Sequence, residues 1–359
     1  MIILNQKVNF IFAPCNKKWV NLQIRRSRAF SSTLMIIFLV LISTNLYTIA
    51  SGQVTTVPVK LVTVVWAPHF FAFLAQEKNL FEKNHVNVQI ELVPDYIPAV
   101  KSYEDGDFDG IFEVYSDAIL QQSQGIDTKV VYNTDLSDTG DVIVDMLENL
   151  TDVKGKTISV EGINSYSHLF LIRALESVGL DESDIHLINL PATNVTDALD
   201  KDEISAGYTY QPYTQEALKK GYNIIFNAGK IPGTISDVIA FHSDFVSKRP
   251  DAVRAILFSF SEAEKYYEDN KKESLNIMSN LTGVSVEEIA QGLNQSRVLD
   301  LYDNYYYSMK NSNQSNSLYN SGKYIGNFFL DRGQISDYPD LNKIIDPKFV
   351  TDLFNTNPE

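Results

Sequence analysis

The sequence predicts an α/β protein built of two lobes, on three observations. The chain of 359 residues is longer than one small core needs and long enough for two. Short β-branched strands alternate with helical patterns in two successive stretches, residues 57–138 and residues 141–232. The sequence from Phe245 onward is helical in pattern. We therefore expect two sheets covered by helices, followed by a helical segment.

Residues 1–52 differ in character from the rest of the chain. The basic stretch Arg25-Arg26-Ser27-Arg28 precedes the apolar run Leu34–Ile42, and small residues follow at Ala50-Ser51-Gly52. This is the order of a signal peptide. Because a membrane span needs roughly 20 apolar residues, a retained N-terminal membrane anchor is the alternative. Both interpretations place the remaining body outside the cytoplasm, either secreted or tethered to the outer face of the cytoplasmic membrane.

The charge and the cysteine count exclude several classes of function. The whole chain carries −15, and residues 1–52 hold six basic residues and no acid, which leaves −15 − 6 = −21 for the body. Such an acidic body argues against binding to nucleic acid or to anionic lipid. We therefore expect membrane contact only through the possible N-terminal anchor. The single cysteine, Cys15, excludes disulfides within the chain, cysteine-rich zinc sites and a thiol nucleophile in the body.

The first stretch opens with the buried strand Leu61–Val65, which breaks at Trp66-Ala67-Pro68. Proline suits the first turn of a helix, so we expect one helix over Pro68–Phe81. The β-α-β order that follows predicts a mainly parallel sheet. The further elements expected are a strand Val86–Val93, a helix Ile97–Tyr103, a strand Ile111–Val114, a helix Ala118–Gln124 with Ser116 or Asp117 as its N-cap, and a strand Thr128–Tyr132.

The second stretch repeats this alternation. The apolar run Val142–Met146 is followed by expected strands at Thr157–Val160, Ile185–Leu190, Ile204–Tyr208 and Asn223–Phe226, with helices at 165–176, Asn194–Leu199 and Thr214–Lys220. One more strand, Val238–Phe241, leads to the helices Pro250–Glu268, Lys271–Leu281 and Ser285–Leu293, the last with a Ser-Val-Glu-Glu capping box. We expect Ser308–Asn320 to be a surface loop, and short helices at Tyr324–Leu330 and Phe349–Phe354.

Motifs of catalysis and metal binding are absent from the sequence. It contains neither a glycine-rich phosphate loop nor a G-x-S-x-G nucleophile elbow, and its five histidines lack the spacing of metal ligands. We therefore predict no catalytic residue, no metal site and no cofactor. The protein is predicted not to be an enzyme.

Polar and aromatic side chains recur at strand ends and helix starts in both lobes. In open α/β sheets these junctions bind ligands, and small molecules prefer sites between domains. Taken singly, each residue is explained as well by capping or packing: Trp66 as a core residue, His69 as an exposed residue at a helix start. Their recurrence at equivalent positions predicts one site for a small-molecule ligand. The predicted ligand-binding residues are Trp66, His69, Tyr96, Glu113, Tyr115, Asp117, Asp138, Ser165, Tyr166, His168, Tyr210, Gln211, Tyr213 and Asp237.

Several short motifs between Val59 and Phe349 occur in an order and spacing typical of one family. They are Trp66-x-Pro68, Leu74–Phe81, Gly106–Asp109, Leu150–Lys156, Tyr210-Gln211-Pro212-Tyr213, Ile231-Pro232-Gly233 and Lys248-Arg249-Pro250. On these motifs the body resembles the periplasmic-type substrate-binding proteins of ABC transporters, specifically the nitrate/sulfonate/taurine and thiamine-pyrimidine-precursor group.

This resemblance implies the two-lobed, hinged α/β fold called periplasmic-binding-protein type II, whose lobes close on a ligand. Lobe one would comprise residues 57–138 and 236–359, and lobe two residues 141–232. It further implies the extracytoplasmic solute-binding component of an ABC importer. Such a protein would be a monomer whose closed form is recognised by the ABC permease of the same system.

Three departures from the family pattern are visible. Related enzymes that make the thiamine pyrimidine from bound pyridoxal phosphate carry a cysteine-rich motif, which the body lacks. Residues 202–206 differ from the usual Gly-x-x-Asp-Ala turn. Asn79 stands where glycine is usual after the first helix, a position that asparagine can also occupy with φ > 0.

The predicted site is rich in carboxylates and aromatic rings and holds no arginine. Nitrate or a sulfonate needs arginine, lysine or a bare helix N-terminus. Carboxylates and aromatic rings instead favour a pyrimidine-like or amine-bearing ligand, which stacks and donates hydrogen bonds. The alternatives from other classes are a membrane-anchored ligand sensor and an enzyme on the same fold.

Overall fold

The computed structural model describes residues 57–356, and the predictions made for residues 1–52 lie outside this range. The described chain forms two mixed sheets. The six-stranded first sheet has the order β11-β4-β10-β3-β1-β2, and the five-stranded second sheet has the order β7-β6-β8-β5-β9. The prediction of two helix-covered sheets is therefore confirmed.

The first sheet is less parallel than predicted. Its strands are β1 (Val59–Val64), β2 (Val88–Val93), β3 (Gly110–Val114), β4 (Thr128–Ser137), β10 (Ser236–His242) and β11 (Ser296–Val298). β1 runs parallel to β2 and β3, but β10 is antiparallel to both β3 and β4, and β11 is antiparallel to β4. The chain leaves this sheet at the end of β4 and re-enters beside it, with Ser236 opposite Leu136, so β10 must run backwards.

Strand β4 is five residues longer than the predicted end at Tyr132. The polar stretch Asn133–Ser137, which reads as a turn, stays extended and buried because β10 pairs with it on one side and β11 on the other. Strand β11 itself was not expected, since three residues carry too little pattern to predict a strand.

The second sheet matches the predicted elements closely. Its strands are β5 (Asp141–Asp145), β6 (Thr157–Val160), β7 (His186–Asn189), β8 (Ala206–Tyr210) and β9 (Asn223–Asn227). β6 runs parallel to β7 and β8, and β5 runs antiparallel to β8 and β9. The chain passes between the two sheets at residues 138–140 and returns after β9. The lobe boundaries themselves stay a prediction.

The predicted helix Pro68–Phe81 is broken into three pieces. A 3-10 turn, Ala67–Phe70, leads into α2 (Phe71–Glu77), and α3 (Leu80–Lys83) follows after Asn79. Asn79 has φ 55°, a left-handed conformation in which no α-helix continues. The apolar side chains nevertheless face the core as expected, because Phe70, Phe71 and Leu74 are buried.

Two further local predictions are wrong. Helix α5 begins at Tyr115 and its N-cap is Val114, so Ser116 and Asp117 lie inside the first turn, where Asp117 still faces the positive end of the helix. The stretch Ser308–Asn320 is not wholly a surface loop, because Ser308 and Ser317 are buried and α14 already begins at Leu318. The predicted capping box of α12 is confirmed at Ser285 and Glu288.

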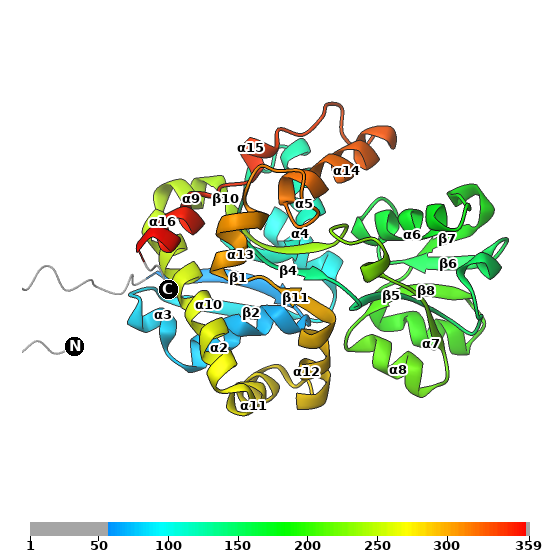
Figure 1. Cartoon of the computed structure of the whole chain (residues 1–359), viewed down its shortest axis with the longest axis horizontal. Helices are drawn as coiled ribbons and strands as arrows, with labels where there is room; N and C mark the ends of the chain where they lie inside the picture. The colour runs from blue at the N-terminus through cyan, green and yellow to red at the C-terminus, as the bar shows by residue number, and fades with distance from the viewer. Residues whose placement is uncertain (1–56, 357–359) are drawn as a thin grey trace, which may run out of the picture. The chain divides into compact units, whose positions relative to one another are not determined.

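The remaining helices cover the two sheets. They are α4 (Tyr96–Glu104), α5 (Tyr115–Ser123), α6 (Tyr166–Ser177), α7 (Val195–Asp200), α8 (Tyr213–Lys219), α9 (Ser243–Lys248), α10 (Pro250–Asp269), α11 (Lys271–Thr282), α12 (Val286–Gln295), α13 (Leu301–Asp303), a π-helix (Asn304–Ser308), α14 (Leu318–Asp331), α15 (Leu341–Ile344) and α16 (Lys348–Thr356). Helix α10 packs on α2 and α3, α14 and α15 pack on α5, and α16 packs on α10 and β4. The helical C-terminal segment thus covers the first sheet (Figure 1).

Within residues 57–356, no helix combines the length and the apolar character that crossing a bilayer requires.

The left-handed conformation of Asn79 gives a first prediction. Asn79→Gly should leave the free energy of unfolding nearly unchanged, because glycine adopts φ > 0 without cost. Asn79→Val should lower it by about 1–2 kcal/mol, since a β-branched residue is strained there. Urea unfolding measures both variants, with Glu82→Val in the ordinary helical backbone of α3 as the control. An Asn79→Val protein as stable as the wild type would refute the assignment.

Candidate ligand-binding site

Side chains attached to the two sheets meet in four places. The ring of Trp66, just after β1, lies edge-on to Tyr210 at the end of β8, with centroids 6.1 Å apart. Tyr96 and Tyr166, the first residues of α4 and α6, form a T-shaped pair at 5.0 Å. The Tyr213 hydroxyl donates to the Pro94 carbonyl at 3.4 Å, and the Thr193 hydroxyl donates to Asp95 at 3.2 Å. The structure therefore brings predicted site residues of both sheets together.

The aromatic residues continue along the second sheet. Tyr208 lies 5.7 Å from Tyr166 and 6.2 Å from Tyr210, and Tyr210 lies 5.5 Å from Tyr213, measured between ring centroids. Trp66 touches the crossing segment as well, since a Cβ atom on Gly140 would stand 2.6 Å from its ring. Only glycine at position 140 leaves room for the indole.

Five buried carboxyl groups lie among these rings, and we call them the acid cluster: Asp117, Asp135, Asp141, Glu161 and Asp237. In the first sheet region, Asp117 accepts a hydrogen bond from the Tyr96 hydroxyl at 2.6 Å, and Asp135 accepts one from the Trp66 indole at 3.1 Å. In the second, the Tyr208 hydroxyl donates to Asp141 and the Tyr166 hydroxyl to Glu161. The rings thus turn their donor groups toward the carboxyl groups.

Burial raises the pKa of every member of the acid cluster. The pKa of Asp117 and that of Glu161 rise to about 7, and the pKa of Asp141 rises to about 6. Burial also holds the pKa values of Asp135 and Asp237 well above the usual range. Near neutral pH, part of the cluster therefore holds protons.

The five groups also repel one another across the two sheets. Asp237 raises the pKa of Asp135, and Asp141 raises the pKa of both Asp237 and Glu161. The interactions that lower these pKa values come from neutral hydrogen-bond donors and from His69; no lysine or arginine of residues 57–356 is among them. The acid cluster is one electrostatic unit without a permanent positive partner in the described chain.

His69 is buried beside this cluster, so its interpretation as an exposed helix-start residue is wrong. Its Nδ1 lies 2.9 Å from the Thr63 hydroxyl, and its Nε2 lies 3.5 Å from Asp237. Burial lowers the pKa of His69 to about 4, so the imidazole is neutral at pH 7 and does not form an ion pair with Asp237.

Several buried polar atoms near the rings have no hydrogen-bond partner in the described chain. They include His69 Nε2, the Tyr210 hydroxyl, and both amide atoms of Gln211. Buried polar atoms are nearly always paired in folded proteins, so unpaired ones indicate groups that a ligand or water satisfies.

The other predicted residues contact different parts of the chain. Glu113 accepts from Gln121 at 2.7 Å, and Ser165 donates to the Gly162 carbonyl at 2.7 Å. Tyr115 is buried against Gly322 of α14. The backbone N–H of Asp138 donates to the Gln295 carbonyl at the crossing segment. None of these contacts joins the aromatic rings of the first sheet to those of the second.

His168 belongs to a separate contact between α6 and the C-terminal segment. Its Nε2 lies 3.3 Å from Glu182, and its ring packs on Phe328. Arg332, just after α14, donates to both oxygens of Glu182 at 2.7 and 3.0 Å and to Asn164 Oδ1 at 2.8 Å. Burial and Arg332 lower the pKa of His168 to about 4, which keeps it neutral.

The predicted ligand-binding residues do not include Asp135, Asp141 and Glu161, nor Tyr208, although Tyr208 stands in the same polar and aromatic stretch as Tyr210. Asp135 lies in the polar stretch taken for a turn, and its burial becomes visible only once β10 and β11 flank it. Asp141 and Glu161 stand at the ends of β5 and β6 that face the crossing segment and α6, and their place at strand ends is the signal that would have found them.

Among residues 57–356, no group of three or more histidine, cysteine or acidic side chains is arranged to hold a metal ion. The members of the acid cluster influence one another without converging on a single point.

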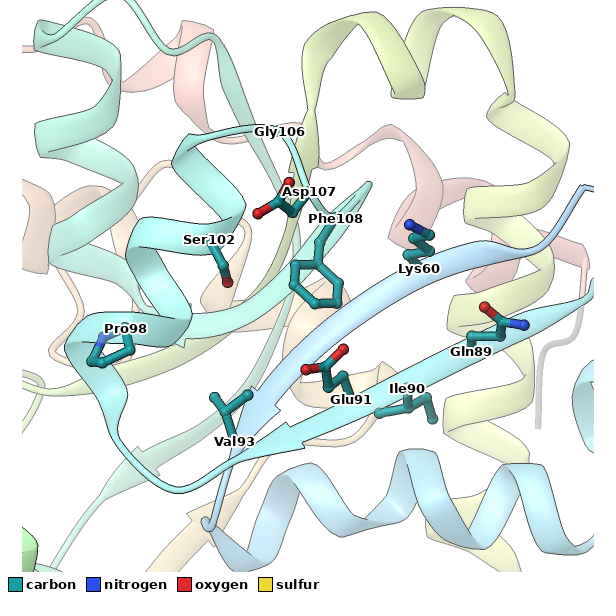
Figure 2. A pocket seen from close by; sticks show the side chains of 10 residues that line it. All are labelled: Lys60, Gln89, Ile90, Glu91, Val93, Pro98, Ser102, Gly106, Asp107 and Phe108. Atoms are coloured by element: carbon teal, nitrogen blue, oxygen red, sulfur yellow. The ribbon is translucent and has the colours of Figure 1, made fainter.

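A hollow of about 690 Å³ lies away from these residues, between α4 and the strands β1 and β2. Lys60, Glu91, Ser102, Asp107 and Phe108 are among the residues that line it (Figure 2). None of the predicted ligand-binding residues takes part. The charged residues that line it are of both signs, so the hollow favours neither cations nor anions.

The raised pKa values predict how stability depends on pH. A carboxyl group whose pKa is higher in the folded than in the unfolded chain stabilises the fold at low pH, and this stability is lost as pH rises through the folded value. For Asp117 and Glu161 that value is about 7. The unfolded values are about 4. Without ligand, these groups should therefore make the melting temperature fall between about pH 4 and about pH 7 and leave it level above that.

Calorimetry of the double variant Asp117→Asn/Glu161→Gln checks this, because it should flatten the pH dependence. The buried histidines, with pKa values lowered to about 4, act in the opposite sense over much of the same range. They are the same in both proteins, so the difference between variant and wild type reports the two carboxyl groups. Asp200→Asn is the control, since Lys220 lowers the pKa of that exposed carboxyl group. A double variant with the wild-type slope would contradict the assignment.

Comparison with known proteins agrees with this architecture. The family model described as NMT1/THI5 like matches residues 66–274. The taurine-binding periplasmic protein of Escherichia coli (strain K12) is 26% identical over 142 residues, which are 37% of this chain and 44% of that protein. The chain thus matches less than half the length of the curated relatives, 46% and 44%.

Solved structures show the same fold. The periplasmic aliphatic sulphonate binding protein SsuA from Escherichia coli superposes with a TM-score of 0.64 at 17% identity, over 80% of this chain and 96% of that one. The desulfurization enzyme DszB superposes with a TM-score of 0.63 at 14% identity, over 83% of this chain and 99% of that one. The periplasmic-binding-protein fold expected from the motifs is therefore confirmed. Because the family model spans more than half of its residues, the chain belongs to the NMT1/THI5-like family.

Proposed function

We propose that the chain is the extracytoplasmic solute-binding component of an ABC importer and that it binds an amine-bearing or pyrimidine-like cation between its two sheets. The observation that carries this proposal is the acid cluster. Five buried carboxyl groups surround the contact between the sheets, and no lysine or arginine of the described chain offsets them.

An anionic ligand would need hydrogen-bond donors at this contact. The hydroxyls of Tyr96, Tyr166 and Tyr208 already donate to members of the acid cluster, as does the indole of Trp66. Besides the unpaired atoms of Tyr210, Gln211 and His69, the contact offers carboxyl oxygens, whose ionised form would repel a sulfonate or nitrate. A cation instead replaces the protons that the raised pKa values hold on the cluster at neutral pH.

The aromatic rings and the unpaired amide of Gln211 also fit a flat ligand with nitrogen atoms. Trp66, Tyr210 and Tyr213 form a row against which a flat ligand can stack or pack edge-on. Gln211 follows Tyr210 with an unpaired donor and an unpaired acceptor on one amide. An aminopyrimidine presents the complementary acceptor and donor side by side.

The partners and the location follow from the family and the relatives. A taurine-binding relative is a periplasmic protein, and a periplasmic solute-binding protein delivers its ligand to a permease. We propose that this chain acts in the same way outside the cytoplasm, as a monomer with lobes at residues 57–138 plus 236–359 and at residues 141–232. Tethering by the N-terminal segment is compatible with this role.

Isothermal titration calorimetry with an aminopyrimidine, an aliphatic diamine, taurine and nitrate tests the proposal. We expect binding of the diamine or of the aminopyrimidine. The diamine, whose amines stay protonated, should bind more tightly at pH 8 than at pH 6, with release of protons from the acid cluster. Proton release appears as a dependence of the binding enthalpy on the buffer. Tight binding of taurine or nitrate alone would refute the cationic ligand and favour an anion, as in the relatives. Mass spectrometry of the compound that co-purifies with the protein gives an independent answer.

Single carboxyl groups on each side of the contact should matter for affinity. Asp117→Asn and Asp141→Asn, one from each sheet region, should each weaken binding of the cation by about tenfold or more, because each removes a charge-assisted hydrogen bond. Asp200→Asn, an exposed carboxylate paired with Lys220, should leave affinity unchanged. Equal affinity in all three variants would place the ligand elsewhere.

A further inference from the structure

We propose that Asn304, which lies on the π-helix outside the acid cluster, is a positioning residue that aims Asp135 toward Trp66 and Asp237. Only the effect on affinity rests on the proposed function. The effect on Asp135 itself rests on the geometry of strand β4.

Asp135 owes its direction to an irregularity in β4. Asp237 of β10 stands opposite Asp135, and the next residue, Val238, stands opposite Asn133, so Thr134 is an extra residue in the strand. Such a bulge bends the strand and redirects the side chains beside it. The Thr134 hydroxyl lies 2.9 Å from Asp135 Oδ1 and 3.0 Å from the Asp237 carbonyl, which ties the bulge to the cluster.

On the side of the bulge away from β10, a side chain makes the backbone hydrogen bonds that a neighbouring strand would normally make. Strand β11 pairs with β4 as far as Asp135, and the Leu299 N–H after it still donates to the Thr134 carbonyl at 2.9 Å. At Asn133, the next step, Asn304 Oδ1 accepts from the backbone N–H and Asn304 Nδ2 donates to the carbonyl, both at 2.8 Å. These are the two bonds that a peptide group of a neighbouring strand would make.

The amide of Asn304 is also fixed at its own end. Nδ2 lies 3.2 Å from the Leu299 carbonyl and 3.0 Å from the Asp300 carbonyl, and the residue is fully buried. Ser308, one π-turn further on, accepts from the Asn133 side chain at 2.7 Å. The π-helix thus holds Asn133 by both its backbone and its side chain, and Asp135 follows two residues later.

Trp66 provides a direct readout that needs no ligand. The chain has two tryptophans, and Trp19→Phe leaves Trp66 as the only one. Its indole donates to Asp135 Oδ2 at 3.1 Å, so its fluorescence responds when that carboxyl group moves or gains a proton. Fluorescence of the full-length Trp19→Phe protein against pH then reports the titration of the Trp66–Asp135 pair.

Asn304→Ala in this background should shift the midpoint of that titration by about half a pH unit or more. It should also weaken binding of the cationic ligand about fivefold or more, the loss expected from one displaced hydrogen bond. Asn84→Ala is the matched control, because Asn84 also links distant segments, through Ser259 and Glu262, but is the C-cap of α3. It should lower stability and leave the Trp66 midpoint unchanged.

If Asn304→Ala does not fold, Ser308→Ala removes the second anchor of Asn133 with a smaller change and should shift the midpoint in the same direction. A folded Asn304→Ala protein with the wild-type midpoint overturns the positioning role, whatever the ligand. A shifted midpoint in a protein that binds no cation supports the positioning role and refutes the proposed ligand class. The two inferences therefore fail separately.

Discussion

The burial of five carboxyl groups without a fixed counter-charge is the constraint on which the rest of this structure depends. Moving one ionised carboxylate out of water costs several kcal/mol unless a partner compensates. Asp117, Asp135, Asp141 and Glu161 meet this cost in part through a hydrogen bond from a tyrosine, a tryptophan, a threonine or a backbone N–H, and in part by holding a proton. The Asp237 carboxyl group lies 3.5 Å from His69 Nε2. This is why we propose a ligand that brings positive charge between the sheets.

Many local features of the structure place hydrogen-bond donors next to these carboxyl groups. Strand β1 ends two residues before Trp66, and the Trp66 indole donates to Asp135 on a different strand, β4. Tyr96 opens α4, where its hydroxyl both donates to Asp117 and accepts from the Val114 N–H at 2.8 Å. The bulge in β4 and the π-helix that pairs with it are departures from regular geometry, and both stand next to the cluster. Irregular strands and π-helices are common at functional sites.

The sequence carries enough information for most elements of the fold and for one half of the contacts that make up the candidate site. Strand β6 is predicted to the residue, and the strands of the second sheet follow from alternation and β-branched runs. Trp66, Tyr96, Tyr166 and Tyr210 stand at strand ends and helix starts, where position alone predicts that they meet. These strands and the positions of these aromatic residues follow from local sequence pattern, which a single sequence shows.

The other half depends on distant partners and could not be predicted. Asp135 lies in a polar stretch that is extended only because β10 and β11, more than a hundred residues later, pair with it. Asn304 reads as one polar residue in a tyrosine-rich stretch, and its contact with Asn133 spans 171 positions. Tyr115 and His168 have the right local setting but contact the C-terminal segment instead.

The close fit of Gly140 beneath the Trp66 ring has a consequence for how related sequences diverge. A side chain at position 140 and an indole at position 66 exclude each other, so position 140 can take a side chain only where position 66 has no indole. A smaller residue at position 66 would leave room for a side chain at position 140. The pair is a marker by which relatives that keep this indole against the crossing segment can be recognised from sequence.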